Sequence, residues 1–150
     1  MSFSDSDIDQ VTSTAFELML GLEIQRNHHP LQQVRTVQYV TGCVHISGAW
    51  GGSMTVACTE HLARKATAIM FASEEAAVSD EEIQDAVGEL SNIIAGNIKG
   101  LYDGNCSVSL PVVVSGVDYD LRVPGTTLVG QYVYDCLDQS LVITILNHRD

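Results

Sequence analysis

Apolar and polar positions follow a helical period between residues 78 and 104. Ser79 and Glu82 have the spacing of a capping box, and Val78 and Ile83 have that of a hydrophobic staple. At about 100° per residue, the apolar side chains fall on one side, which is expected to face the core: Ile83, Ala86, Val87, Leu90, Ile93, Ile94, Ile98 and Leu101. The pattern predicts an amphipathic helix of about 24 residues ending near Gly104.

The opposite side of this helix has an unusual composition, since an ordinary solvated face is rich in Lys, Glu and Gln. Glu89 and Asn92 stand one turn apart, and small residues surround them. The whole set on this side is Asp85, Gly88, Glu89, Asn92, Ala95, Gly96 and Lys99. A glycine inside a helix costs about 1 kcal/mol relative to alanine, and it allows close approach of another molecule. The pattern therefore indicates a flat patch that offers a carboxylate and a carboxamide to a partner. The alternative is an ordinary solvated surface.

The rest of the chain predicts two more helices, at 8–24 and 60–71, the second capped by Thr59. In that second helix, Ile69 and Phe71 are expected to be buried. Strands are predicted at 34–46, 53–58, 106–110, 112–115, 119–123, 127–135 and 140–147. Residues 1–7 are expected to be disordered. The order of elements predicts an α+β fold, a single domain of residues 1–150 with one antiparallel sheet and long helices packed on it.

Composition narrows the possible partners. Seven basic residues against 19 acidic ones give a net charge of −12, which excludes nucleic acid and an anionic membrane surface. The sequence has no apolar run long enough to span a membrane, and its polar, acidic beginning MSFSDSDIDQ predicts a cytoplasmic protein. Because so acidic a body does not attract a phosphorylated partner at long range, any such recognition must be local.

Other reactive residues are interpreted as structural. The four cysteines have no C-x-x-C spacing and are expected to be reduced thiols in or near the core. His28 and His29 have no acidic or cysteine partners at ligand spacing, so we expect a solvated loop and no metal site. Trp50 is expected to cover the end of a hairpin. Asn97 projects beside Ile93 and is expected to be buried with its amide bound to backbone.

The segment ELSNIIAGNIKG, which contains Glu89, Asn92 and Gly96, resembles the E-x-x-N helix of the CheC/CheX/FliY family of chemotaxis phosphatases. Four other stretches agree in order: FELMLGLEI at 16–24, SGAWGGSMTV at 47–56, LPVVVSG at 110–116 and VPGTTLV at 123–129. Longer family members have a second E-x-x-N, but here Glu17 is followed at the third position by Leu20. A single motif in a stand-alone chain resembles the CheX branch in particular.

The resemblance implies hydrolysis of the aspartyl phosphate on a CheY-like receiver domain. Asn92 would position the attacking water, and Glu89 would pair with the receiver's lysine. Docking would involve Asp85, Gly88, Ala95, Gly96 and Lys99. The chain itself would bind no cofactor, because Mg²⁺ is expected on the receiver. The resemblance also implies a strongly twisted sheet and a homodimer through a sheet edge.

Two alternatives remain open. The first is a non-catalytic module that binds a receiver, or acts in a flagellar-switch-like assembly, through the same helix face. The second is a stand-alone hydrolase or metal enzyme built on His28, His29, His45 or His61, which no spacing in the sequence supports.

Overall fold

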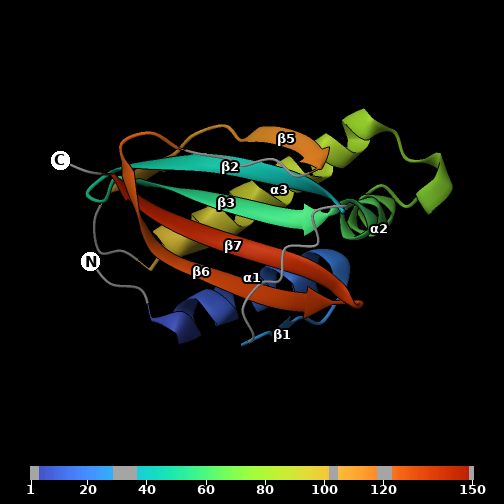
Figure 1. Ribbon diagram of the computed structural model, residues 1–150, viewed down its shortest axis with the longest axis horizontal. Coiled ribbons are helices and arrows are strands. Elements are labelled where there is room, and N and C mark those ends of the chain that lie inside the picture. The colour runs from blue at the N-terminus through green and yellow to red at the C-terminus, as the bar shows by residue number, and fades with distance from the viewer. Residues whose placement is uncertain (1–3, 29–36, 102–104, 118–122, 149–150) are drawn as a thin grey trace.

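The computed structural model describes residues 4–28, 37–101, 105–117 and 123–148 (Figure 1). Helices and strands combine in one α+β unit, as predicted. The helices are α1 (Asp5–Leu20), α2 (Glu60–Met70), the short 3₁₀ helix η1 (Glu75–Ala77) and α3 (Asp80–Lys99). The strands are β1 (Gln25–Arg26), β2 (Gln38–Gly48), β3 (Gly52–Thr59), β4 (Cys106–Val108), β5 (Val112–Val117), β6 (Thr126–Cys136) and β7 (Gln139–His148).

All seven strands belong to one antiparallel sheet, in the order β1-β6-β7-β3-β2-β4, and β5 pairs with β2 on the same side as β4. The three long helices lie on one face of this sheet, with α2 at one end of the molecule (Figure 1). Val44, Met54 and Ile145 stand in register on three neighbouring strands, and all three are fully buried. Because alternate strand residues face alternate sides, this register places one apolar face of the sheet against the helices.

Helix α1 begins earlier than predicted. Its cap is Ser4, which forms a capping box with Asp7, so the expected disorder of residues 1–7 is wrong for residues 4–7. Residues 1–3 lie outside the described part of the chain. The helix ends at Leu20, before residue 24, because Gly21 adopts the left-handed conformation that terminates helices.

Strand β1 is missing from the sequence prediction, and it anchors α1. Arg26 of this strand donates to Asp9 of α1 over 2.7 Å, and the hydroxyl of Tyr134 on β6 donates to the same carboxylate oxygen, also over 2.7 Å. Burial raises the pKa of Tyr134, and the bond to Asp9 raises it further, so the hydroxyl remains a donor at neutral pH. Together these contacts fasten α1 to the edge of the sheet.

The remaining predicted elements differ in detail. The predicted strand at 119–123 falls almost wholly outside the described residues, and Val123 itself is not in a strand. Helix α2 begins after the predicted cap, where the Thr59 hydroxyl accepts from the Leu62 amide. Ile69 and Phe71 are exposed rather than buried, although Thr67 and Ala68 in the last turn of α2 are buried, so only one side of that turn is covered. Helix α2 lies at one end of the molecule (Figure 1).

Trp50 and the cysteines occupy structural positions. The Trp50 ring is buried at the β2–β3 turn, and its indole nitrogen donates to the side chain of Asn147 over 2.6 Å. All four cysteines are free, and burial raises the pKa of Cys58 to about 12, which keeps it a thiol at neutral pH. No helix in the described ranges has the length and apolar character to cross a membrane.

Candidate functional site

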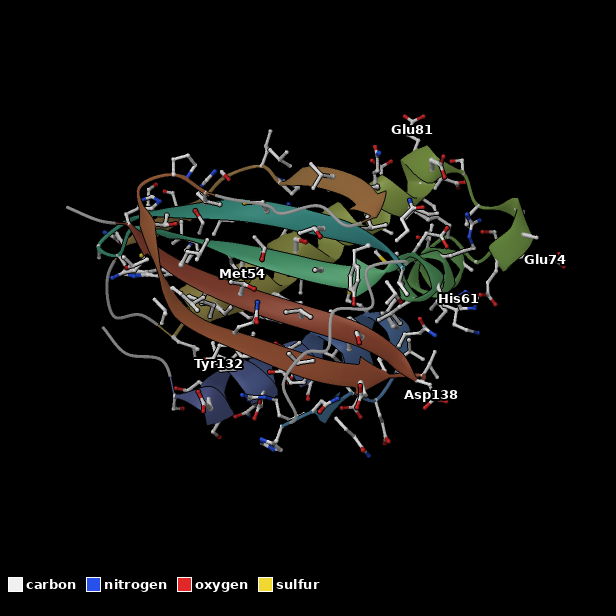
Figure 2. The ribbon with its side chains drawn as sticks, viewed as in Figure 1. Met54, His61, Glu74, Glu81, Tyr132 and Asp138 are labelled. Carbon is white, nitrogen blue, oxygen red and sulfur yellow. The ribbon has the colours of Figure 1, made fainter. Side chains whose placement is uncertain are left out.

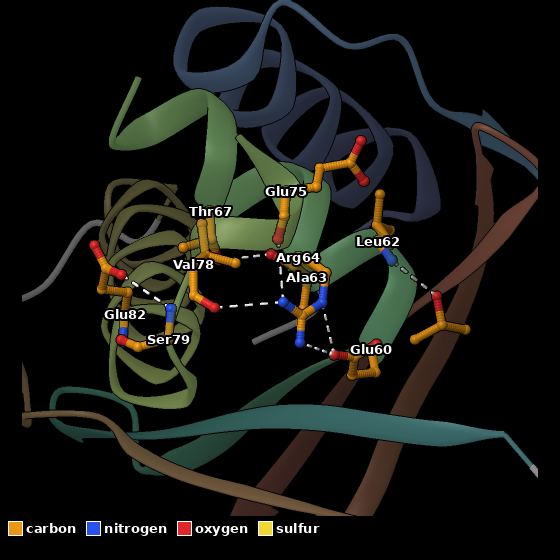
Figure 3. A network of polar contacts seen from close by, with 10 residues as sticks. Glu60, Leu62, Ala63, Arg64, Thr67, Glu75, Val78, Ser79 and Glu82 are labelled. Carbon is orange, nitrogen blue, oxygen red and sulfur yellow. Dashed lines mark hydrogen bonds and ion pairs between the residues drawn. The ribbon is translucent and has the colours of Figure 1, made fainter. Parts of the chain in front are cut away.

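The start of α3 is fixed as the sequence predicts. The Ser79 hydroxyl accepts from the Glu82 amide over 3.1 Å, and the Glu82 carboxylate accepts from the Ser79 amide over 2.9 Å (Figure 3). Val78 and Ile83 are both buried, as a hydrophobic staple requires. The helix ends at Lys99, before the predicted Gly104, and Leu101 is exposed rather than part of the core.

Arg64 of α2 ties that helix to the start of α3. Its guanidinium donates to the carbonyl oxygens of Glu75 and Val78, over 3.1 and 3.4 Å. Glu60 holds the same guanidinium from the preceding turn over 2.8 Å (Figure 3). Since Val78 directly precedes the cap of α3, these bonds fix the position from which the helix starts.

The middle of α3 lies unusually close to the sheet. A Cβ atom added at Gly42 of β2 would stand 2.1 Å from Ser91 Oγ and 3.0 Å from Ser91 Cβ. Ser91 is fully buried, and its hydroxyl donates to the Val87 carbonyl over 2.7 Å. A serine on the apolar side of a helix and a glycine inside a strand are each signals of close approach that the sequence prediction did not use. Gly42 and Ser91 therefore position the helix.

One stripe of α3 faces outward. Asp85, Glu89, Gly96 and Lys99 are exposed and Asn92 is half-buried, at spacings of three and four residues that align them along the helix. A Cβ atom added at Gly96 would meet nothing within 4 Å. Neither the Glu89 side chain nor the Asn92 side chain forms a hydrogen bond or ion pair with another residue in the described ranges. Both side chains are therefore available to another molecule.

Three residues of α3 are placed differently from the prediction. Gly88 and Ala95 are buried, so their predicted place on the open side is wrong. A Cβ atom at Gly88 would stand 3.3 Å from Pro111 Cγ, so this glycine makes room for the chain between β4 and β5. Asn97 is exposed, and its predicted burial is also wrong. The docking role of Asp85, Gly96 and Lys99 stays a prediction.

The chemistry of the stripe is limited. A carboxylate can accept hydrogen bonds or pair with a cation, and a carboxamide can both donate and accept. Within the described part of the chain, no three His, Cys, Asp or Glu side chains are grouped so as to hold a metal ion. The Glu89–Asn92 pair contains no hydroxyl, thiol or amine nucleophile, so the proposed kind of reaction at this surface needs groups supplied by a partner.

A comparison with protein-family models matches one family. The family model described as "Chemotaxis phosphatase CheX" matches residues 40–136, a range that includes the whole of α3. A comparison with curated proteins gives no match.

Solved structures share the fold at low sequence identity. CheX from Vibrio vulnificus superposes with a TM-score of 0.77 and 24% identity, over 94% of this chain and 93% of that one. CheX from Desulfovibrio desulfuricans gives 0.76 and 18%, over 93% and 95%. A chain in the CheX-CheY-BeF3-Mg²⁺ complex from Borrelia burgdorferi gives 0.68 and 17%, over 97% of each chain. These similarities support the fold of the whole described unit.

Proposed function

Because the chain belongs to the CheX family of chemotaxis phosphatases, we propose that it hydrolyses the aspartyl phosphate of a CheY-like receiver domain. The observation that carries the proposal is the outward stripe of α3, on which Glu89 and Asn92 have no partner among the described residues. The Borrelia burgdorferi structure of a CheX with CheY, BeF3 and Mg²⁺ supports a receiver as the partner.

The proposed reaction divides its groups between two proteins. The receiver supplies the phosphoryl group, the Mg²⁺ and a lysine, and this chain supplies the means of holding a water molecule. The water oxygen bonds to phosphorus while the bond between phosphorus and the aspartyl oxygen breaks, which releases inorganic phosphate and a free carboxylate. Phosphoryl transfer depends mainly on positioning and on stabilisation of charge, so one well-placed amide has a large effect.

Asn92 is assigned to the water, because its carboxamide can accept one hydrogen bond and donate another. Glu89, one turn earlier, is assigned to the receiver's lysine, a charge-assisted contact that sets the register of the two proteins. Gly96 leaves the next turn clear of side-chain atoms. With a net charge of −12 on the chain, recognition of a phosphorylated receiver has to come from such local contacts, to which Lys99 contributes the one cation of the stripe.

Replacing Glu89 with glutamine is expected to weaken docking to a receiver activated with beryllofluoride by about tenfold, because a charge-assisted hydrogen bond becomes a neutral one. Titration of the labelled receiver by fluorescence anisotropy measures this change. The matched control is Glu81→Gln, which removes the same charge about 12 Å earlier along the helix and should leave docking unchanged. Equal losses in the two variants would mean that general charge, and not a Glu89 contact, controls docking.

Phosphate release from a phosphorylated receiver tests the proposed activity itself. The chain is expected to speed release beyond the receiver's own rate of hydrolysis. A complex that forms without shortening the lifetime of the phosphoryl group would favour the alternative, a non-catalytic receiver-binding or flagellar-switch-like module.

We also propose that two copies pair along the β5 edge of the sheet. Strand β5 pairs with β2 on one side, and no strand in the described ranges pairs with its other side. Leu110 and Val112 at this edge are 86% and 61% exposed. An open strand edge with exposed apolar side chains favours pairing with another chain.

Val112→Lys is expected to convert the dimer to a monomer, because an edge lysine disfavours strand pairing. Light scattering after size exclusion measures the mass. Leu128→Lys on β6 makes the same kind of change at a side chain that is 63% exposed, and it should leave the dimer intact. A monomeric native protein would contradict the dimer. If Leu128→Lys dissociated the dimer and Val112→Lys did not, the interface would lie at the β6 edge of the sheet and not at β5.

A further inference from the structure

A hollow of about 490 Å³ opens at the end of the molecule, away from the residues of α3. Its lining includes Leu22, Lys65, Ile69, Glu74, Glu75 and Leu137, which come from the segment just after α1, from α2, from the start of η1 and the residue before it, and from the β6–β7 turn. Figure 2 marks this end of the molecule by Glu74 and Asp138. We call it the α2-end hollow. None of its lining residues has a role in the proposed hydrolysis.

Backbone strain is concentrated around the α2-end hollow. Leu137 and Asp138 form the two-residue turn between β6 and β7, with φ angles of 51° and 61°. Such a turn favours Asn-Gly or Asp-Gly, because a leucine is disfavoured in the left-handed region. Ala72, just after α2, has a φ of 50° where helices usually carry glycine. In the described ranges these are the three non-glycine residues with positive φ, and strain retained in this way often marks a functional surface.

Large apolar side chains are exposed at this end of the molecule. Ile69, Phe71 and Leu137 are 44%, 45% and 49% exposed, although each is large and apolar. Packing therefore does not require the leucine at position 137, and Asn or Gly would fit its backbone better. A group of exposed apolar residues around a hollow is typical of a site that binds another molecule.

The charged residues around the α2-end hollow indicate which kind of molecule can bind there. Lys65 is already paired with Glu75 at 3.4 Å, so its charge is balanced. Glu74 and Asp138 have no cation within salt-bridge distance in the described part of the chain. A second copy docked through the same surface would place Glu74 and Asp138 against the same two carboxylates, and this local repulsion disfavours self-association at the hollow. We propose that the α2-end hollow docks a segment of a partner protein in which Lys or Arg residues flank one or two large apolar side chains.

The probe for this site is a labelled 14-residue Leu/Lys helical peptide with its leucines on one face, compared with the same peptide carrying serine in place of leucine. Fluorescence anisotropy at about 0.15 M salt measures binding while non-specific attraction is screened. The Leu/Lys peptide is expected to bind the native protein at least about tenfold more tightly than the Ser/Lys peptide. Equal affinities for the two peptides would show that binding depends on charge alone, and this result would overturn the proposal.

Two variants place the binding in the hollow. Ile69→Ser and Leu137→Asn are each expected to weaken binding of the Leu/Lys peptide by about tenfold, because each removes an apolar contact. Leu128→Ser, a matched change at an exposed leucine of β6 that does not line the hollow, should bind like the native protein. Native affinity in both hollow variants would overturn the proposal.

Leu137→Asn also separates a binding role from a structural one. Asparagine tolerates the left-handed region, so the variant is expected to unfold at the same temperature as the native protein or higher, even though it binds the peptide less well. A marked fall in the unfolding temperature would assign Leu137 to stability and overturn the proposal.

Discussion

Replacing Asn92 with alanine is expected to lower the rate of phosphate release from a phosphorylated CheY-like receiver by about 100-fold or more, with docking changed by less than about threefold. The reason is that the carboxamide is proposed to contact the water and not the receiver. Its loss therefore lowers the rate of hydrolysis and leaves the affinity for the receiver almost unchanged. Single-turnover release of phosphate measures the rate, and anisotropy with the beryllofluoride-activated receiver measures docking. The receiver's own hydrolysis is subtracted.

The same helix offers a matched control for the Asn92 change. Asn97→Ala removes the same group from another exposed position of α3, outside the stripe of Glu89 and Gly96. This variant should retain native activity and native docking. Full activity in Asn92→Ala would contradict the proposed mechanism, and a parallel loss of activity and docking would make Asn92 a docking residue.

How much of this site the sequence predicts depends on the range of the interactions involved. The start of α3 depends on contacts between residues three to five apart, and the predicted cap of Ser79 and Glu82 is confirmed. The outward position of Glu89 follows from the helical period alone and is also confirmed. Both features are local, so a single sequence contains the necessary information.

Positions at the border of the stripe depend on contacts that the sequence does not show. Gly88 lies beside Pro111, and Gly42 lies beside Ser91, in each case across a long separation along the chain. A helical period says which residues share a side, but it does not say how far the neighbouring strands extend over that side. For this reason the helical period places Gly88 on the wrong side and wrongly predicts a buried Asn97.

The end of α2 illustrates the same limit. Ile69 is at helical spacing from the buried Leu62 and Ala66, so the pattern predicts burial. The structure exposes Ile69, because no described element covers its side of the last turn, whereas Thr67 and Ala68 in the same turn are buried. The unusual Leu-Asp pair in the β6–β7 turn is visible in the sequence, yet its positive φ angles come only from the strand pairing on both sides.

Gly42→Ala is expected to destabilise the protein by about 2 kcal/mol and to lower phosphatase activity with it. The added Cβ would stand 2.1 Å from Ser91 Oγ, so the buried hydroxyl must leave the Val87 carbonyl or α3 must move away from β2. Movement of α3 carries Asn92, the residue next to Ser91, out of position. Urea unfolding measures the stability, and phosphate release measures the activity.

A second substitution tests whether contact with Ser91 is the cause. Adding Ser91→Gly removes both atoms that the new Cβ meets within 3 Å, so the double variant should regain most of the lost stability, less about 1 kcal/mol for a glycine inside a helix. Gly96→Ala adds the same methyl group to α3 where nothing lies within 4 Å, and it should leave stability unchanged or higher by up to about 1 kcal/mol. Additive losses for Gly42→Ala and Ser91→Gly would show that the two sites are independent, and the position of α3 would then depend on other contacts.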